Sequence, residues 1–449
     1  MASAYRLALT GDLILNTKVS TCREPDVLAA IGLLRGADVT HAHLEIPLTD
    51  LVGPEVFGSA EGALSWMRAP TAIAGELREL GIDLVSAASN HSLDWSYGGL
   101  RSTIAALDGV GIPHAGIGDD LAAARAPAFA DTAVARVALV SATSSFPAFA
   151  LAGASRSDVR GRPGVNPQRY VSVIDSVTAE RLAAIASQLG QWVVRRDDEL
   201  VLHPPGLHNS IVRLRVDDDA AAPHTICDAE DLAGNLTSIR WARTVSDLVI
   251  AHLHVQAWDG ADGRMSSSPA FATEFAHAAI GAGAAVVLVQ GSHAPMRGIE
   301  VFDGVPVLYD PGPLFRLGRR DVQPHDFYLR WGNDPAVRSF DADLIDAYAA
   351  RDGADGRAPT VLSPTEGNTH EPGFVLPVCE VDATTHRVAE VRLHPMRWSA
   401  ARRATTGFPG VVTGSDAHDV LRHLQSLCDP YGTNVAIDGD VGVVAVGAV

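Results

Sequence analysis

Short apolar segments with the composition of β-strands alternate with helical patterns over the first 146 residues. The first strand-like segment covers residues 5–15, and helical patterns follow at 26–35, 72–80 and 99–109. Such alternation is typical of α/β folds, in which connecting loops carry functional groups at the ends of parallel strands. The alternation of strand-like and helical segments resumes after about residue 234. We therefore predict an α/β fold for most of the chain.

The alternation of strand-like and helical segments is interrupted between about Pro147 and Gly234. This segment contains a loop rich in Gly, Pro and Arg, then one predicted helix and irregular polar sequence. Long irregular segments within a compact domain are usually functional or disordered. We predict that residues 147–234 are an insertion that covers the site as a lid; a surface excursion that only extends the fold is the alternative. The pattern of residues 374–449 predicts a pair of strands followed by a helix. We expect these elements to complete a single domain that covers residues 1–449.

Composition excludes several classes of function. The 449 residues carry a formal net charge of -18, which argues against nonspecific binding to nucleic acid or anionic membranes. The four cysteines form no CxxC pair and predict reduced, buried thiols. No segment resembles an export signal or a membrane span of about 20 apolar residues. We expect a soluble, cytoplasmic protein that acts on a small molecule, and self-association into a homo-oligomer is compatible with the sequence.

Polar side chains that can bind metal follow five of the predicted strands. Carboxylate, imidazole and amide oxygen are ligands for Zn²⁺, Mn²⁺ or Fe²⁺. Because strand ends of an α/β fold share one edge, these groups can converge on one or two ions. The groups are Asp12, then His41, His43 and Glu45, then Asn90 and His91, then His252, His254 and Gln256, and finally Gln290 and His293.

Each of these groups also has an ordinary structural explanation when it is taken alone. Asp12 can be a turn residue after Gly11, Asn90 can cap a helix, and His252 or His254 can simply pack in the core. The recurrence of such groups at five strand ends favours a shared metal site over five independent explanations.

The motifs resemble those of a known family, the CapA or poly-γ-glutamate capsule synthesis family of the calcineurin-like metallophosphoesterase superfamily. The resemblance covers nearly the whole chain and is most specific in "SNHSLDWSYGGLRSTIAALDGVGIPHAGIG", residues 89–118. It also rests on "LTGDLIL", "GADVTHAHLEIPL", "GRPGVNP", "SDLVIAHLH", "HAPMRGIEVFDGVPVLYDPG" and the late "PYGT". The resemblance implies a sandwich of two mixed β-sheets flanked by helices, with a one- or two-metal site at the strand ends.

Matched positions imply roles for individual residues. The resemblance makes Asp12, Glu45, Asn90, His254 and His293 metal ligands, and it places His91 where the superfamily has an acid that protonates the leaving group. We add His43, which stands where the family has the Asn of its Asn-Leu-Glu motif, as a predicted ligand or direct contact.

Three further departures separate this chain from the family pattern. Gln256 and Gln290 stand where the family has histidines, and Asp310 appears where it has a Ser-Leu-Gly-Asn-Phe motif. These changes indicate a remodelled or single-metal site, and complete loss of metal binding is the alternative.

These patterns together predict a metal-dependent hydrolase that cleaves an amide, ester or phosphoester bond of a cytosolic, anionic small molecule. His91 would protonate the leaving group, and Arg162 would bind the anionic substrate, as Arg297 could. Both arginines can equally be surface residues. A metal-dependent lyase or isomerase and a non-catalytic accessory protein of the same family remain alternative functions.

Overall fold

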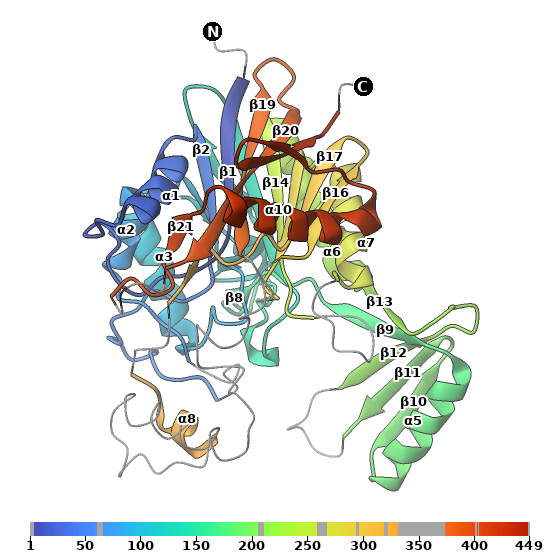
Figure 1. Cartoon of the computed structure of the whole chain (residues 1–449). Helices are drawn as coiled ribbons and strands as arrows, with labels where there is room; N and C mark the ends of the chain where they lie inside the picture. The colour runs from blue at the N-terminus through green and yellow to red at the C-terminus, as the bar shows by residue number, and fades with distance from the viewer. Residues whose placement is uncertain are drawn as a thin grey trace, which may run out of the picture.

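Two large mixed β-sheets form the centre of the molecule (Figure 1). The computed structural model describes residues 4–60, 66–204, 211–257, 267–292, 296–317, 322–330, 373–399, 402 and 404–447. The predicted ligand His293 lies outside the described residues. Within them, the predicted α/β class is confirmed, whereas the specific metallophosphoesterase arrangement stays a prediction.

The larger sheet has ten strands and joins the two ends of the chain. The predicted C-terminal strand pair is present, and its first strand runs antiparallel to the first strand of the protein. In order across the sheet the strands are β22 (Ala436–Asp438), β23 (Val441–Ala445), β20 (Val388–Trp398), β19 (Phe374–Asp382), β1 (Ala4–Ile14), β2 (Val39–Leu44), β3 (Leu84–Ser86) and β4 (His114–Ala115), with β18 (Phe315–Arg316) beside β1 and β21 (Pro409–Val411) beside β20.

The second large sheet has six strands, of which the four central ones are parallel. Strands buried on both faces read as nearly continuous apolar runs, which explains sequences such as "LVIAHLH". In order the strands are β16 (Gly298–Phe302), β17 (Val305–Tyr309), β15 (Val286–Gln290), β14 (Leu248–His254), β7 (Arg136–Thr143) and β6 (Ala128–Asp131).

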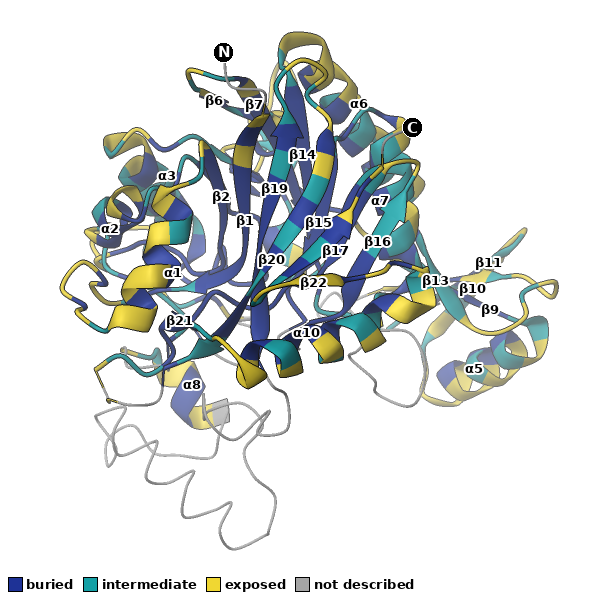
Figure 2. Cartoon of the chain, turned by 45° about the horizontal axis from the view of Figure 1, so that its top comes forward, coloured by how far each residue is buried: buried dark blue, intermediate teal, exposed yellow. Residues whose placement is uncertain are grey.

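The two sheets pack against each other, and helices cover the outer sides. Leu139, Ile250 and Leu288 of the six-stranded sheet belong to the same buried cluster as Leu7 and Leu9 of β1. Figure 2 shows the strands of both sheets as largely buried. The opposite face of the six-stranded sheet packs on helices α6 (Ala229–Val245) and α7 (Ala270–Gly281).

The remaining helices lie outside the two large sheets. None of the described helices is both long and apolar enough to cross a membrane. Helices α1 to α3 lie beside β2 (Figure 1). The bounds are α1 (Pro25–Arg35), α2 (Ile73–Glu79), α3 (Ser96–Gly109), α4 (Leu121–Arg125), α8 (His325–Arg330) and α10 (Ser415–Cys428), with 3-10 turns at Ala148–Ala150 and Asp429–Tyr431.

A third sheet lies within the segment that was predicted to be an insertion. Figure 1 shows this unit projecting from the body of the protein beyond α7, where Cys227 N donates to Glu274 of that helix. Its strands are β10 (Trp192–Arg196), β11 (Glu199–His203), β12 (Val212–Val216), β9 (Tyr170–Ile174) and β13 (His224–Cys227), and α5 (Ser176–Gln188) packs on one face. The predicted boundary at residue 234 falls inside α6.

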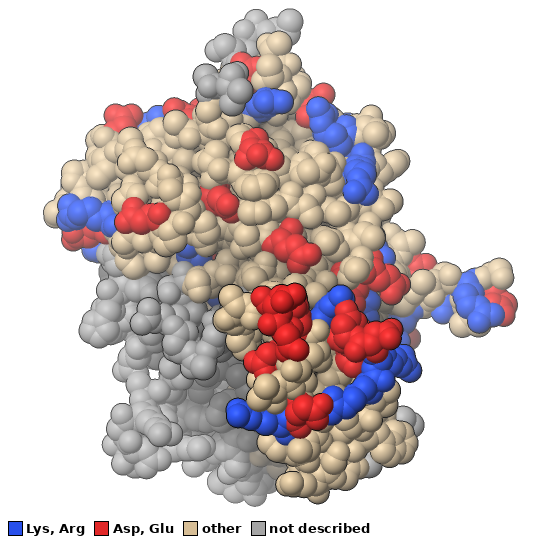
Figure 3. Space-filling view, turned by 90° about the vertical axis from the view of Figure 1, so that its right-hand side faces the viewer, with Lys and Arg blue, Asp and Glu red and all other residues tan. Residues whose placement is uncertain are grey.

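Several charged side chains on the insertion pair with one another. Figure 3 shows acidic and basic side chains side by side on the lower part of the molecule. Arg195 pairs with Glu180 at 2.9 Å, and Arg215 pairs with Asp198. These arginines are therefore partly neutralised and do not form a purely basic surface.

The four cysteines are free and buried, as predicted. Burial raises the pKa of the Cys379 thiol to about 12, and the Cys428 thiol is similarly affected at about 11. The thiolate is the reactive form of cysteine. These side chains therefore serve packing and not chemistry at neutral pH.

The glycine of the opening Gly-Asp motif allows two backbone segments to touch. A Cβ added to Gly11 would lie 1.9 Å from the carbonyl oxygen of Gly312, so any side chain forces β1 away from the loop before β18. We expect Gly11→Ala to lower the free energy of unfolding by about 3 kcal/mol, because the obstructing atoms are backbone and cannot rotate aside. Urea unfolding measures this loss.

The matched control is Gly32→Ala, at an exposed position in α1 where an added Cβ meets nothing within 4 Å. This change should raise stability by about 0.5–1 kcal/mol, since alanine is the better helix former. Equal unfolding midpoints for wild type and Gly11→Ala would contradict the close approach of the two segments.

Candidate metal centre

Four buried histidine rings form a column between the two large sheets. His41 and His43 come from β2, and His252 and His254 come from β14. Ring centroids of His41 and His252 are 5.6 Å apart, those of His252 and His43 are 4.6 Å apart, and those of His43 and His254 are 4.9 Å apart. Side chains two residues apart on a strand face the same side, so each strand contributes two rings and the rings interleave. We call these four residues the histidine column.

Hydroxyl groups on neighbouring strands hold the rings of the column. Each hydroxyl belongs to the residue directly opposite its histidine in the parallel ladder. Partners that orient a metal-binding imidazole in this way typically also fix which nitrogen faces the metal. The pairs are His43 Nδ1 with Ser86 Oγ at 3.0 Å, His252 Nδ1 with Ser141 Oγ at 3.1 Å, and His254 Nδ1 with Thr143 Oγ1 at 3.4 Å.

Burial keeps His41, His43 and His252 uncharged. Desolvation lowers the pKa of His43 well below its usual value, and the neighbouring imidazoles lower it further. Desolvation also lowers the pKa of His252 well below its usual value and that of His41 to about 3. Neutral imidazole is the form that binds metal, so these rings are ready for coordination at neutral pH.

Asp12, His43 and His254 form a group that could hold a metal ion. One ligand atom from each of these buried residues lies within 4.8 Å of the other two, and His43 Nε2 is 3.9 Å from Asp12 Oδ1. Two ligands of one ion, each about 2.0–2.2 Å from it, lie at most about 4.4 Å apart. His43 Nε2 is buried and has no hydrogen-bond partner among the described residues. The donor set therefore fits a divalent cation after a small contraction.

A β-bulge places Asp12 on the same face as His43. Leu9 pairs with His41 and Asp12 with His43, so β1 has one more residue than β2 between the two pairs. Without this extra residue, the alternation of side chains would direct Asp12 to the other face of the sheet. Gln290 at the end of β15 donates from Nε2 to Asp12 Oδ1 at 3.0 Å.

Gly291 lies directly against the end of the column. Its φ is +115°, and an added Cβ would lie 2.5 Å from His254 Nε2. Only glycine combines this backbone conformation with such a close approach to the ring. The Gly in the "VQGSH" motif is thus explained by contact with His254.

The loop after β3 carries Asn90 and His91 into buried positions. Asn90 Nδ2 donates to Gln256 Oε1 at 3.0 Å, and Asn90 Oδ1 is buried without a hydrogen-bond partner among the described residues. His91 Nδ1 lies 2.7 Å from Asp94 Oδ2, which also accepts from Met67 N at 2.6 Å. Asp94 thus fixes the orientation of the His91 ring.

The structure brings together three of the six predicted metal ligands, namely Asp12, His43 and His254. Glu45 is buried one residue beyond β2 but does not join the group among the described residues. The roles of Glu45, Asn90, His91 and His293 stay predictions.

The two candidate arginines differ in their surroundings. Arg162 is exposed, and its Nε donates to the Leu151 carbonyl at 2.7 Å, so its role in binding substrate stays a prediction. Arg297 is buried and donates to the Ala257 carbonyl at 3.2 Å. Burial lowers the pKa of the Arg297 guanidinium.

Sequence reasoning missed three features that shape this centre. His41 was noted at its strand end but not chosen as a site residue, although its spacing from His43 was the available signal. Gln290 was interpreted only as a residue that replaces a family histidine. In the structure, Gln290 donates a hydrogen bond to Asp12. No sequence signal marked Ser86 and Ser141 as partners of the rings.

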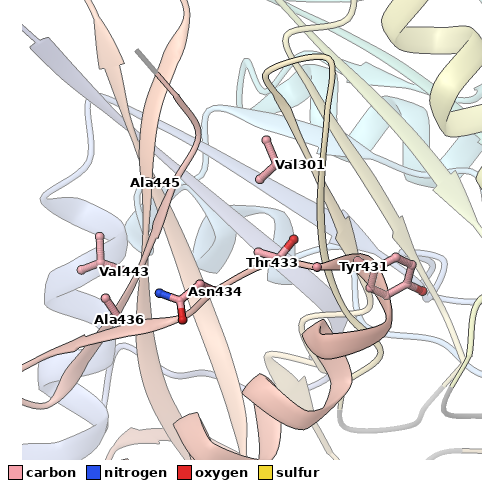
Figure 4. Close-up of a pocket in the computed structure, with 8 residues that line it drawn as sticks. Val301, Tyr431, Thr433, Asn434, Ala436, Val443 and Ala445 are labelled. Atoms are coloured by element: carbon pink, nitrogen blue, oxygen red, sulfur yellow. The ribbon is translucent and has the colours of Figure 1, made fainter. Parts of the chain in front are cut away.

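A separate surface pocket lies between β16, β23 and the "PYGT" segment (Figure 4). It has a volume of about 270 Å³, and none of the predicted catalytic or metal-binding residues lines it. Val301, Tyr431 and Val443 contribute apolar surface to it, and Thr433 and Asn434 contribute polar groups. The pocket is thus distinct from the histidine column.

Comparison with known proteins identifies the family. Residues 6–315 match the sequence model of the family described as "Bacterial capsule synthesis protein PGA_cap". The chain belongs to this family. The matched range of this capsule synthesis family contains Asp12, His43, Asn90, His91 and His254, so the resemblance drawn from the motifs is confirmed.

Individual relatives extend the match. An uncharacterised protein of Sinorhizobium fredii is 29% identical over 453 residues, covering 99% of this chain and 94% of its own. A probable polyglutamine synthesis accessory protein of Mycobacterium tuberculosis is 31% identical over 227 residues, covering 51% of this chain and 43% of its own.

Proposed function

We propose that the protein is a divalent-metal-dependent hydrolase of a small anionic molecule. The observation that carries the proposal is the buried group of Asp12, His43 and His254, which lies at the ends of β1, β2 and β14 and includes two rings of the histidine column. A divalent cation bound there would supply a Lewis acid and would lower the pKa of a water to near neutrality.

His91 is the proposed acid. The Asp94 carboxylate accepts a hydrogen bond from His91 Nδ1–H, which leaves Nε2 as the ring nitrogen that can face a leaving group. A positioned imidazole of this kind protonates a leaving oxygen or nitrogen as the bond to it breaks. Asp94 acts through His91 and is a positioning residue, not a catalytic one.

Binding of the substrate is assigned to the loop side of the centre. Residues 164–168 of the predicted lid return to the end of β7, where Thr143 N donates to the Asn166 carbonyl and Gln168 N donates to the Thr143 carbonyl. This contact supports the proposal that the segment contributes to the site, with Arg162 as the proposed partner of a carboxylate or phosphate.

A panel of substrates tests the proposal. The purified full chain, stripped of metal and reloaded with Mn²⁺ or Zn²⁺, should hydrolyse at least one of a set of small anionic amides, esters and phosphoesters, and chelation should abolish the reaction. Asp12→Asn should remove the activity while leaving the fold intact. A loaded protein that is inactive on every bond class would contradict hydrolysis.

A non-catalytic accessory role is the second candidate. It is favoured by the printed name of the mycobacterial relative, a probable polyglutamine synthesis accessory protein. Bound metal without turnover on the panel would support this role, as would the absence of bound metal. A lyase or isomerase that uses the cation only as a Lewis acid would release products without consuming water, which ¹⁸O-labelled water detects.

A further inference from the structure

We infer that this centre holds one divalent cation and not two, because the amides of Gln290 and Gln256 form hydrogen bonds with Asp12 and Asn90 and contribute no imidazole for a second cation. The inference rests on the proposed function and deepens it by fixing the metal stoichiometry. Gln290 and Gln256 are positioning residues in this account.

Gln290 forms a hydrogen bond to one oxygen of Asp12, which is the only carboxylate in the group of Asp12, His43 and His254. Its Nε2 donates to Asp12 Oδ1 at 3.0 Å, and both side chains are buried. The hydrogen of such a bond lies about 2.0 Å from the oxygen, which is also the distance at which a cation would bind. An N–H and a second cation cannot use the same lone pair, so this hydrogen bond removes one of the acceptor sites through which Asp12 could bridge two ions.

Gln256 fixes the amide of Asn90. Asn90 Nδ2 donates to Gln256 Oε1 at 3.0 Å, and Gln256 N in turn donates to Ser145 Oγ at 2.8 Å. This pairing directs one end of the Asn90 amide to Gln256 and leaves Oδ1, which has no hydrogen-bond partner among the described residues, as its acceptor for a ligand. Gln256 thus orients Asn90 and does not present an imidazole of its own.

The charge of the group also suits one ion. It contains one carboxylate and two imidazoles. Two dications about 3.5–4 Å apart need several negative ligands to offset their repulsion. Within the described residues, no second group of three metal-binding side chains accompanies the first.

Counting bound manganese tests the inference. The full chain is stripped with a chelator, reloaded with excess Mn²⁺ and desalted, and the metal is measured by mass spectrometry together with the electron paramagnetic resonance spectrum. We expect one Mn²⁺ per chain and a six-line spectrum without exchange coupling. Gln256→His combined with Gln290→His should bind a second ion and give an exchange-coupled spectrum.

Each other outcome overturns a definite part of the account. Two Mn²⁺ per wild-type chain would overturn the inference and leave the proposed hydrolase standing. No Mn²⁺ or Zn²⁺ in the wild type would overturn both. A double variant with a native circular dichroism spectrum that still holds one ion would overturn the role assigned to the two glutamines.

Discussion

Replacing His91 by Asn should lower kcat by about 10²–10⁴-fold, the range typical of losing a general acid. His91 is buried, and Asp94 holds its ring by the 2.7 Å contact to Nδ1. The loss should be larger for substrates with poor leaving groups, such as alkoxides, than for p-nitrophenolate, because a stable leaving group needs no proton. Kinetics on two such substrates of the same bond class measure both effects.

His114→Asn is the matched control for this change. His114 at the start of β4 also lies near an aspartate, with Nδ1 3.8 Å from Asp108 Oδ1, but it does not belong to the group of Asp12, His43 and His254. Its replacement should leave kcat unchanged. A loss in His91→Asn that is the same for both leaving groups would assign His91 to positioning instead of proton transfer.

His43→Gln should weaken binding of the divalent cation by at least about 100-fold, since even the partners that only support a ligand typically contribute 10–100-fold. His43 Nε2 lies 3.9 Å from Asp12 Oδ1. Isothermal titration of the metal-free protein with Zn²⁺ measures the change directly.

His41→Gln separates loss of a ligand from damage to the column. His41 is equally buried, and its Nε2 contacts the same Ser86 hydroxyl, yet it is not in the group with Asp12 and His254. We expect its replacement to change the affinity by less than about threefold, well below the effect of losing a supporting partner. Equal losses in the two variants would show that His43 acts through packing.

Local patterns predicted most of the elements of the fold. The continuous apolar run of β14 and the paired pattern of β19 and β20 predicted strands that the structure confirms. The pairing of β19 with β1 was not predictable, because it joins residues more than 360 positions apart and depends on which edge of the sheet is open. The five-stranded sheet of the insertion was also missed, since its short strands are rich in charged residues.

The site was predictable as a set of positions but not as a geometry. The spacing of His252 and His254 predicted that both rings face one side, whereas their interleaving with His41 and His43 depends on how the two sheets pack. Alternation alone would have placed Asp12 away from His43, and Gly11 is the only sequence signal of the bulge in β1 that brings them to one face.

The most direct test of the account is to locate the cation. Crystals of the full chain grown with Zn²⁺ and measured at the zinc absorption edge should show an anomalous peak about 2.0–2.3 Å from a carboxylate oxygen of Asp12 and from ring nitrogens of His43 and His254. A peak at other residues, or none in crystals of protein shown to contain zinc, would contradict the claim that these three side chains hold the metal.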